Sequence, residues 1–142
     1  MKIVIGCDDP NELTESVVAD LKRRGHQVAQ LAPESWPDIA LAAAEAVVSG
    51  AADQGVLFCW TGTGTAMAAN KVTGIRAALV WDPWIADGAR RWNDANVLVM
   101  SSQRTSLDEA RAILDAWFAV EAPDPEEADN IARLGAIERK EP

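Results

Sequence analysis

A cysteine followed by a loop of threonines and glycines is the first stretch of the sequence that could do chemistry. Residues 55–59 form a short apolar run typical of a buried strand, and the Thr-Gly-Thr-Gly-Thr stretch at 61–65 leads into a helix-forming segment. Cys59 is therefore expected at the carboxyl end of a strand, beside the N–H groups of a helix N-terminus. That position is expected to lower the pKa of a thiol, which makes Cys59 a candidate reactive group.

Strand-like and helix-like segments alternate along the whole chain. The expected strands cover residues 2–7, 26–31, 55–59, 75–81 and 96–100. The expected helices cover residues 10–24, 35–48, the segment after 65, 82–93, 106–120 and 124–139. This alternation predicts right-handed βαβ units, and hence a parallel sheet with helices on both faces, in which ligands bind outside the carboxyl ends of the strands.

Several helix starts carry local signals. Asp9 is expected to cap the first helix, with Pro10 at its first position and Glu12 completing a capping box. Ser106 and Glu109 have the same spacing before a later helix. The last helix, 124–139, has an acidic start and apolar residues at every third position, so we expect it to pack on the domain or on a partner subunit.

Composition narrows the classes of function. The 142 residues are 49% hydrophobic, which suits a single domain covering 1–142, and the net charge of −9 opposes sequence-independent binding to nucleic acid or to anionic membranes. No apolar run reaches the length of about 18 residues expected of a membrane span, and the sequence enters a strand at once without a signal-peptide pattern. A cytoplasmic protein is therefore expected. Cys7 and Cys59 are too few for a disulfide framework and lack the spacing of zinc ligands.

Four blocks in a fixed order carry a resemblance to a known family. They are residues 5–8 (Ile-Gly-Cys-Asp), residues 59–64 with 68–71, residues 74–77, and residues 93–98. Together they resemble the ribose-5-phosphate isomerase B and galactose-6-phosphate isomerase family over nearly the whole chain. The resemblance implies a five-stranded parallel Rossmann-like sheet in a three-layer α/β/α sandwich. It also implies a homodimer with active sites shared between subunits, with further pairing into a tetramer left open.

The resemblance further implies aldose–ketose isomerisation through a cis-enediolate, with no metal and no cofactor. It assigns Cys59 as the base and Thr61 as the hydroxyl that helps to open the sugar ring. It assigns the oxyanion to a loop of amides, and the sugar hydroxyls to two polar side chains. The loop residues are Gly62, Thr63, Gly64 and Thr65, and the two side chains are Asp8 and Asn93.

Several positions depart from the family pattern, and most departures remove positive charge. Asp9 and Trp92 stand where the family has histidines, and Trp36 stands where a tyrosine lines the pocket. The turn arginine after the fifth strand is missing, with Arg104 as the one nearby substitute, and the arginine pair of the last helix falls on about Glu126 and Asn130. Because charge-assisted bonds to phosphate contribute roughly 1.5–3 kcal/mol each, we expect ribose 5-phosphate to be a poor substrate.

Each candidate residue also has a structural interpretation. Cys59 could be a small buried hydrophobe, and Cys7 is expected in the core, with a place in the site or a disulfide to Cys59 as alternatives. Asp9 is explained by helix capping, and Asp8 could simply order its loop.

The remaining polar and aromatic residues are interpreted mostly as structural. His26 is expected far from the site, Trp117 in the core, Lys71 and Arg76 at a turn, and Arg90 and Arg91 in solvent rather than at an anion site. Five other tryptophans could stack on a ligand or form a subunit interface. They are Trp36, Trp60, Trp81, Trp84 and Trp92.

The sequence thus predicts a diverged sugar isomerase acting on a sugar or sugar derivative that lacks the usual phosphate. The alternative is a non-catalytic protein that binds a sugar or nucleoside-like ligand on the same dimeric scaffold. A third hypothesis uses the same thiol for other chemistry, such as an epimerisation or a specialised biosynthetic step.

Overall fold

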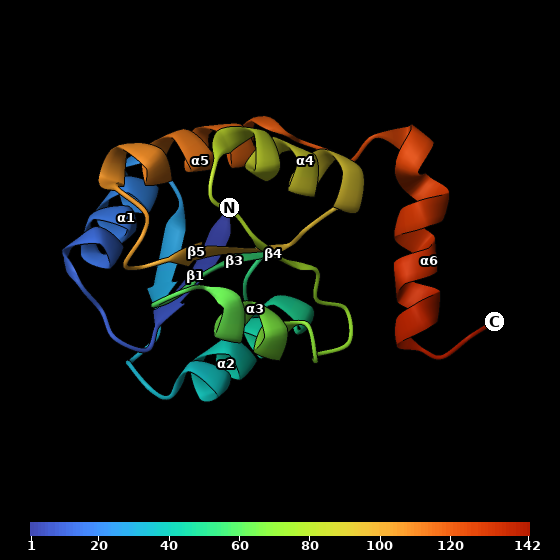
Figure 1. The fold of residues 1–142 in the computed structure, drawn as a ribbon, viewed down its shortest axis with the longest axis horizontal. Helices are drawn as coiled ribbons and strands as arrows, with labels where there is room; N and C mark the ends of the chain where they lie inside the picture. Colours follow the sequence, from blue (N-terminus) through green and yellow to red (C-terminus); the bar gives the residue numbers. More distant parts are fainter.

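A parallel sheet of five strands lies at the centre of the computed structural model, which describes residues 1–142 (Figure 1). The strands follow the spatial order β2-β1-β3-β5-β4, and every neighbouring pair is parallel. Their bounds are β1 Lys2–Cys7, β2 Gln27–Gln30, β3 Gln54–Cys59, β4 Ala77–Leu79 and β5 Val97–Ser101. The predicted parallel sheet is therefore confirmed, and β3, which delivers Cys59, lies at its centre.

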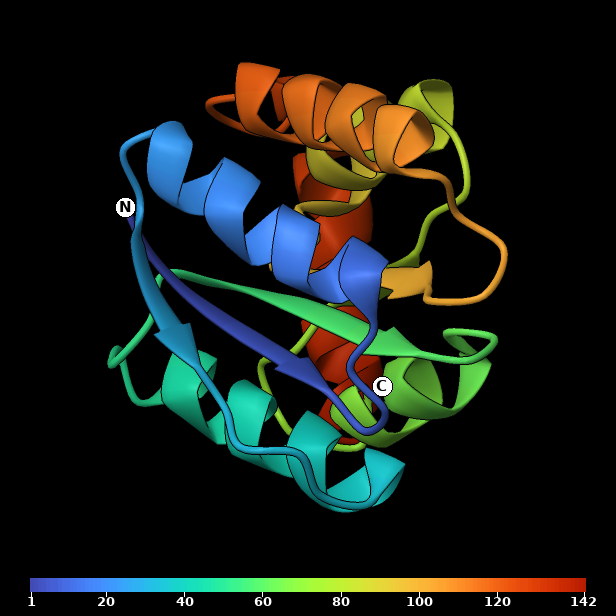
Figure 2. The ribbon, with the colours of Figure 1, turned by 90° about the vertical axis from the view of Figure 1, so that its left-hand side faces the viewer.

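Helices cover both faces of the sheet (Figures 1 and 2). One face carries α1 (Glu12–Arg23), α4 (Pro83–Asn93) and α5 (Leu107–Ala119), and the other carries α2 (Trp36–Val48) and α3 (Thr63–Ala69). A core cluster lies on each face, with 18 buried residues under α1, α4 and α5 and 10 under α2 and α3. The expected three-layer α/β/α sandwich is confirmed. None of the helices is both long and apolar enough to cross a membrane.

The last helix stands at one side of this sandwich (Figure 1). A short 3-10 turn, η1 (Pro125–Glu127), precedes α6 (Ala128–Glu138), so Asp124 caps the turn and not the α-helix itself. The carboxylate of Glu138 accepts two hydrogen bonds from the amide of Gly74, at 3.0 and 3.1 Å. No residue of α6 is buried, although Ile131, Leu134 and Ile137 are apolar.

The start of α1 differs from the prediction. Asn11 caps the helix in place of Asp9: its side chain accepts from the amide of Thr14 at 3.0 Å, and the Thr14 hydroxyl accepts from the amide of Asn11 at 2.9 Å. The side-chain amide of Asn11 also donates to the carbonyl of Ser102, beyond the end of β5. An aspartate carboxylate at this position could accept from the helix amides but could not donate to the carbonyl of Ser102. The bond to Ser102 therefore favours asparagine as the cap.

The fourth strand is shorter than expected. Residues 75–81 were predicted, but the ladder covers only Ala77–Leu79. β4 is an edge strand paired only with β5, and on its open side the amide side chain of Asn70 bonds both the N–H and the C=O of Ala77, at 2.8 and 2.9 Å. A side chain thus occupies polar groups that another strand would otherwise pair.

Candidate active site

Cys59 ends β3 and faces the first turn of α3. The chain reverses at Gly62, whose φ of 79° lies in the left-handed region that favours glycine. A Cβ at this position would lie 2.5 Å from Cδ1 of Leu79 and 3.2 Å from the backbone of Met100. Both the turn and the close approach therefore require glycine, and they bring the start of α3 onto the thiol.

The surroundings of Cys59 favour its thiolate. The side chain is buried, and the hydroxyl of Thr65 lies 3.5 Å from its sulfur. Burial raises the pKa of Cys59, but hydrogen bonds from the Thr65 hydroxyl and from the amides of Thr65, Gly62 and Gly64 outweigh burial and bring the pKa below its ordinary value. The lowered pKa expected from the sequence is confirmed.

Cys7 is the opposite case. It pairs in register with Phe58 and belongs to the core cluster under α1 and α5, whereas Cys59 is one residue further on and faces α3. Because side chains alternate between the faces of a strand, the two thiols point to opposite faces of the sheet, and both are free. Burial raises the pKa of Cys7 to about 11, with the charges of Asp8 and Asp9 adding to the effect and a hydrogen bond from the Asp9 amide opposing it. Cys7 is a core residue, as expected, and the disulfide alternative is wrong.

Two hydroxyls lie at the mouth of the loop. Thr61 and Thr63 are exposed, and their side-chain oxygens are 2.7 Å apart. The amide of Thr63 donates to the Thr61 hydroxyl at 3.3 Å, so this amide is directed away from Cys59. Of the four amides assigned to the oxyanion loop, those of Gly62, Gly64 and Thr65 are the ones that face the sulfur.

Trp60 connects the loop after β3 to the loop after β1. Its indole N–H donates to the carboxylate of Asp9 at 2.9 Å, although both residues are exposed. Asp9 is therefore a partner of Trp60 and not the helix cap. The neighbouring carboxylate of Asp8 has only a long contact from the thiol of Cys7, at 3.9 Å. Apart from this contact the Asp8 side chain forms no hydrogen bond, so its carboxylate is available at the strand end.

Trp36 is the tryptophan that packs directly on the oxyanion loop. A Cβ on Gly64 would lie 3.0 Å from Cε3 of Trp36, which shows that the indole covers this glycine. Trp84 and Trp92 instead contact one another along α4, with ring centroids 5.5 Å apart. All five tryptophans in question are exposed in the single chain, and Trp117 is buried as predicted.

Arg104 lies in the loop between β5 and α5, at the same edge of the sheet as Cys59. Its amide donates to the hydroxyl of Ser101, the residue paired in register with Cys59, while its exposed side chain forms no ion pair. Position and charge therefore make Arg104 available to a ligand.

Asn93 lies at the other end of the molecule. Since α4 runs back from the carboxyl edge of the sheet to its amino edge, its last residue, Asn93, lies beside Arg76 and Ala95, near the starts of β4 and β5. A cavity of about 850 Å³ lies here between α6 and the sheet. Within one chain the structure does not bring Asn93 together with Cys59. Trp92 folds back over Gly88 toward Trp84 and does not line this cavity.

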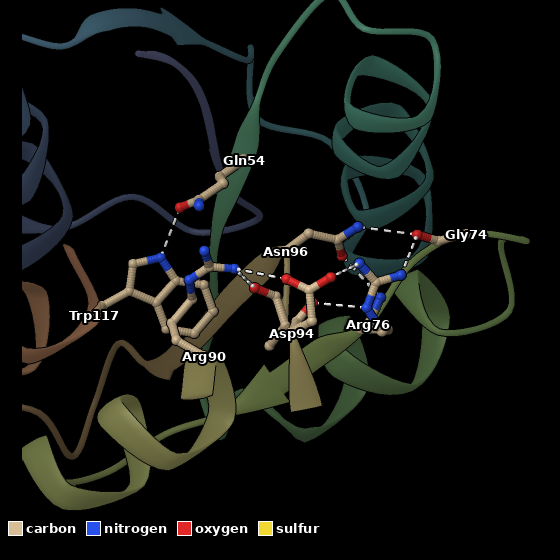
Figure 3. Close-up of polar contacts among 8 residues, drawn as sticks. Gln54, Gly74, Arg76, Arg90, Asp94, Asn96 and Trp117 are labelled. Atoms are coloured by element: carbon tan, nitrogen blue, oxygen red, sulfur yellow. Dashed lines mark hydrogen bonds and ion pairs between the residues drawn. The ribbon is translucent and has the colours of Figure 1, made fainter. Parts of the chain in front are cut away.

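A polar network at the amino edge was not foreseen (Figure 3). Asp94, in a left-handed conformation with φ of 49°, accepts from Arg76 at 3.1 Å and from Arg90 at 3.5 Å, and its carbonyl accepts from Nε of Arg76 at 2.7 Å. Arg76 thus orders a turn, as predicted. Arg90 is only 7% exposed, so the prediction that it is solvated is wrong.

A signal for the burial of Arg90 is present in the sequence. On α4 it follows the buried Ala86 by four residues, while Arg91 falls outside that face and pairs with Asp87 in solvent. Burial lowers the pKa of Arg90, the charge of Asp94 opposes that shift, and Arg76 adds to it.

The only histidine has structural neighbours, as predicted. His26 precedes β2 at the amino edge, stacks on Phe118 with ring centroids 4.5 Å apart, and lies 3.3 Å from the N-terminal amine. Burial lowers its pKa, and the positive charges of the N-terminus and Arg24 lower it further. A histidine is therefore not among the groups that the chain places near Cys59.

The fold and the thiol at the end of its central strand define an α/β protein with a site at the carboxyl edge of a parallel sheet, the usual place for ligands in this class. The chain belongs to the ribose/galactose isomerase family, whose profile matches residues 3–135.

Similar proteins cover from two thirds to nearly all of the chain. It is 36% identical to ribose-5-phosphate isomerase B of Escherichia coli over 145 aligned positions, which cover 98% of this chain and 97% of that one. It is 44% identical over 94 residues to D-erythrulose-4-phosphate isomerase 2 of Mycolicibacterium smegmatis, which covers 66% of this chain and 61% of that one. The solved structure of ribose-5-phosphate isomerase B from Clostridium thermocellum has a TM-score of 0.93 at 38% identity and covers 99% of both chains.

Proposed function

We propose that the protein is an aldose–ketose isomerase in which Cys59 moves the proton. The observation that carries this proposal is the thiol of Cys59, whose pKa is lowered by one hydroxyl and three amides at the end of the central strand. Its relatives are named as isomerases of sugar phosphates, which supports the same class of reaction for this chain.

The proposed reaction balances within one substrate. The Cys59 thiolate removes the proton on the carbon beside the carbonyl, and the electron pair of that C–H bond forms the double bond of a cis-enediolate. The resulting thiol returns the proton to the former carbonyl carbon, while a proton moves between the two oxygens, so the aldose becomes the ketose. Thr61 assists at the ring oxygen beforehand.

The oxyanion would be held by the amides of the 62–65 loop. In the free chain three of these amides face the sulfur, where they stabilise the thiolate. When the proton moves to sulfur, the negative charge moves to the enediolate oxygen, and the same donors become available to it. The same amides would therefore stabilise first the thiolate and then the enediolate.

Charge at the carboxyl edge supports a substrate other than ribose 5-phosphate. Asp8 and Asp9 follow β1, the strand next to β3, at the same edge of the sheet as Cys59, and the indole of Trp60 donates to the carboxylate of Asp9. Arg104 is the one arginine in the loops that follow β1, β3 and β5. A substrate with little or no negative charge, such as a free sugar or sugar derivative, suits this balance better than a phosphate monoester dianion.

We further propose that the site is completed by a second subunit. Asn93, which would bind sugar hydroxyls, lies at the opposite edge of the sheet from Cys59, beside a cavity bordered by α6. A homodimer in which α6 packs on the partner would cover Leu134 and Ile137, which are 45% and 57% exposed in the single chain. Such a dimer would place the Asn93 of one subunit at the Cys59 of the other.

Exchange of hydrogen with solvent tests the isomerase directly. Incubation with aldoses in D₂O should label the carbon next to the carbonyl, because the proton on Cys59 exchanges with water before it returns. Cys59→Ala should lower the labelling rate by about 100- to 10,000-fold, the usual contribution of a general base. Cys7→Ala is the matched control, since it removes a thiol from the other face of the sheet and should keep the rate. Equal labelling by the two variants would exclude Cys59 as the base.

The second candidate function is a non-catalytic protein that binds a sugar or a nucleoside-like ligand. It is favoured by the absence of histidine near Cys59 and by the exposed indoles of Trp36 and Trp60 at the same edge, which can stack on a sugar ring or a base. This function would be favoured over the isomerase by two results together. No sugar, phosphorylated or free, would become labelled, and at least one sugar would quench the tryptophan fluorescence saturably.

The substrate claim has its own test. Turnover of ribose 5-phosphate should be at least about 100-fold less efficient than turnover of the best unphosphorylated sugar, which corresponds to the loss of about two charge-assisted contacts. The comparison uses kcat/KM values from the wild-type protein. A preference for the phosphate, abolished in Arg104→Gln, would instead show that Arg104 binds the phosphate and would overturn the claim.

A further inference from the structure

A second cavity, of about 400 Å³, lies at the amino edge of the sheet, away from Cys59. It is bordered by the first residue of the chain, the start of β3, the buried face of α4 and the end of α5. The polar groups that line it are the N-terminus, Gln54, Arg90, the indole of Trp117 and Glu121. None of these groups has a role in the proposed isomerisation.

Arg90 brings unused donors to this cavity. Both of its hydrogen bonds are made by Nη1, to the carbonyl of Ala95 at 2.6 Å and to the carboxylate of Asp94 at 3.5 Å. Its Nε is buried and has no partner in the protein. The guanidinium lies over the Trp117 ring, 5.7 Å from the centroid, so the ring and Asp94 fix its direction. A guanidinium is always charged and only donates, so its free side calls for an acceptor.

Gln54 adds a second donor, and its orientation is determined by Trp117. The indole N–H can only donate, and it does so to Oε1 of Gln54 at 2.8 Å. The NH₂ group of Gln54 therefore points away from Trp117, and no acceptor in the protein takes a hydrogen bond from it. Figure 3 shows the Gln54 amide and the Arg90 guanidinium facing one another beside the Trp117 ring. Both donors are therefore free to bond an acceptor placed between them.

The charges around the cavity favour an anion as that acceptor. Arg90 carries the one positive charge among the side chains that line the cavity. Asp94 is on the far side of Arg90, where it holds Nη1, and Glu121 is the one carboxylate that lines the cavity. A cation would meet the positive guanidinium of Arg90 and the NH₂ donor of Gln54. An oxyanion would accept from Gln54 and Arg90 at once.

We propose that this cavity binds a small oxyanion, either a carboxylate or a phosphate group, between the NH₂ group of Gln54 and the guanidinium of Arg90. The site is separate from the one at Cys59. An anion bound there would share the guanidinium of Arg90 with Asp94.

The resonance of the Trp117 indole N–H in a ¹H–¹⁵N spectrum reports on the cavity, because its acceptor is Gln54. Sodium phosphate and sodium acetate are titrated separately into the wild-type protein against sodium chloride at equal ionic strength. At least one of the two should shift the Trp117 indole signal saturably, and chloride should not. A response to both would indicate recognition of oxygen atoms in general, and a response to one would identify the preferred geometry.

Gln54→Glu is the sharpest variant. A carboxylate there keeps the bond from Trp117, pairs with Arg90 and occupies the place of the anion, so the fold is retained while affinity for the responding anion falls by at least about tenfold. Arg91→Gln is the matched control: it removes a neighbouring positive charge that faces solvent, and it should bind as the wild type does. The proposal is overturned by an absent or unsaturable shift up to about 50 mM of either anion, or by an unchanged response in Gln54→Glu, which would indicate charge screening alone.

Discussion

The hydroxyl of Thr65 has one proton and two acceptors within reach. Its oxygen lies 3.2 Å from the carbonyl of Gly62 and 3.5 Å from the sulfur of Cys59, and the residue is completely buried. A neutral thiol is a weak acceptor, so the proton goes to the carbonyl until Cys59 ionises, and a thiolate then draws it away. Rotation of one hydroxyl thus stabilises the thiolate of Cys59.

Thr65→Val removes this donor at nearly constant shape and should raise the pKa of Cys59. Because the thiolate is the active form, activity rises with pH through that pKa, and the acid limb of the pH–rate profile should move to higher pH. The pH dependence of iodoacetamide alkylation of Cys59 gives the same pKa without relying on turnover. Thr65→Ser keeps the hydroxyl and is the control. An acid limb that stays in place in Thr65→Val would show that the amides alone set the pKa.

The lowered pKa of Cys59 could be predicted from sequence because its causes are local. The strand, the glycine turn and the helix start lie within seven consecutive residues, Cys59 to Thr65, and all four donors to the sulfur come from this segment. The burial of Arg90 was not predicted, because the residues around it come from distant segments of the chain. Trp117 and Gln54 lie far from it in sequence, and only the packed fold brings them together.

At the scale of elements, α1 is attached at its N-cap to the loop that follows β5. Asn11 caps the helix and also donates to the carbonyl of Ser102, 91 residues away, so one side chain joins the start of α1 to the loop after β5. Both connections lie at the carboxyl edge of the sheet, where the site is built. The cap therefore helps to fix the position of Asp8 and Asp9 relative to the central strand.

Asn11→Ala should lower the free energy of unfolding by about 1–2 kcal/mol, because both the cap and the bond to Ser102 are lost. Asp9→Ala should have little effect, since it removes only the bond from an exposed Trp60. Urea denaturation of the two variants, followed by circular dichroism, measures the difference. A larger loss in Asp9→Ala would mean that Asp9 is the residue that stabilises the helix start.

The caps of three other helices agree better with the sequence-based prediction. Ser35, Asp82 and Ser106 cap α2, α4 and α5 as predicted, because each accepts from an amide three residues ahead and needs no distant partner. The short β4 could not be predicted, since its length depends on where Asn70 meets the open edge of the sheet. Contacts between residues close in sequence can be predicted from the sequence. The length of an edge strand cannot, because it depends on contacts formed only in the folded protein.

At the scale of the whole molecule, the sheet separates two polar regions. The carboxyl edge carries Cys59 with its loop, while the amino edge carries the Arg76–Asp94–Arg90 network and the cavity beside α6. The alternation of segments predicted the parallel sheet and its two helical layers. It did not predict that β5 would lie between β3 and β4, because strand order is decided by packing of the crossover helices.

The distance between Cys59 and Asn93 has a consequence for mixtures of subunits. In the proposed dimer, Cys59→Ala and Asn93→Ala should each be inactive, since every shared site would lack one of the two groups. When the two proteins are dissociated together and reassembled, half of the dimers are mixed, and each mixed dimer has one site with both groups intact and one with neither. Activity should therefore return to roughly a quarter of the wild-type value. If each site lay within a single subunit, the mixture would stay inactive. Two inactive variants can therefore restore activity to one another only if each site takes residues from both subunits.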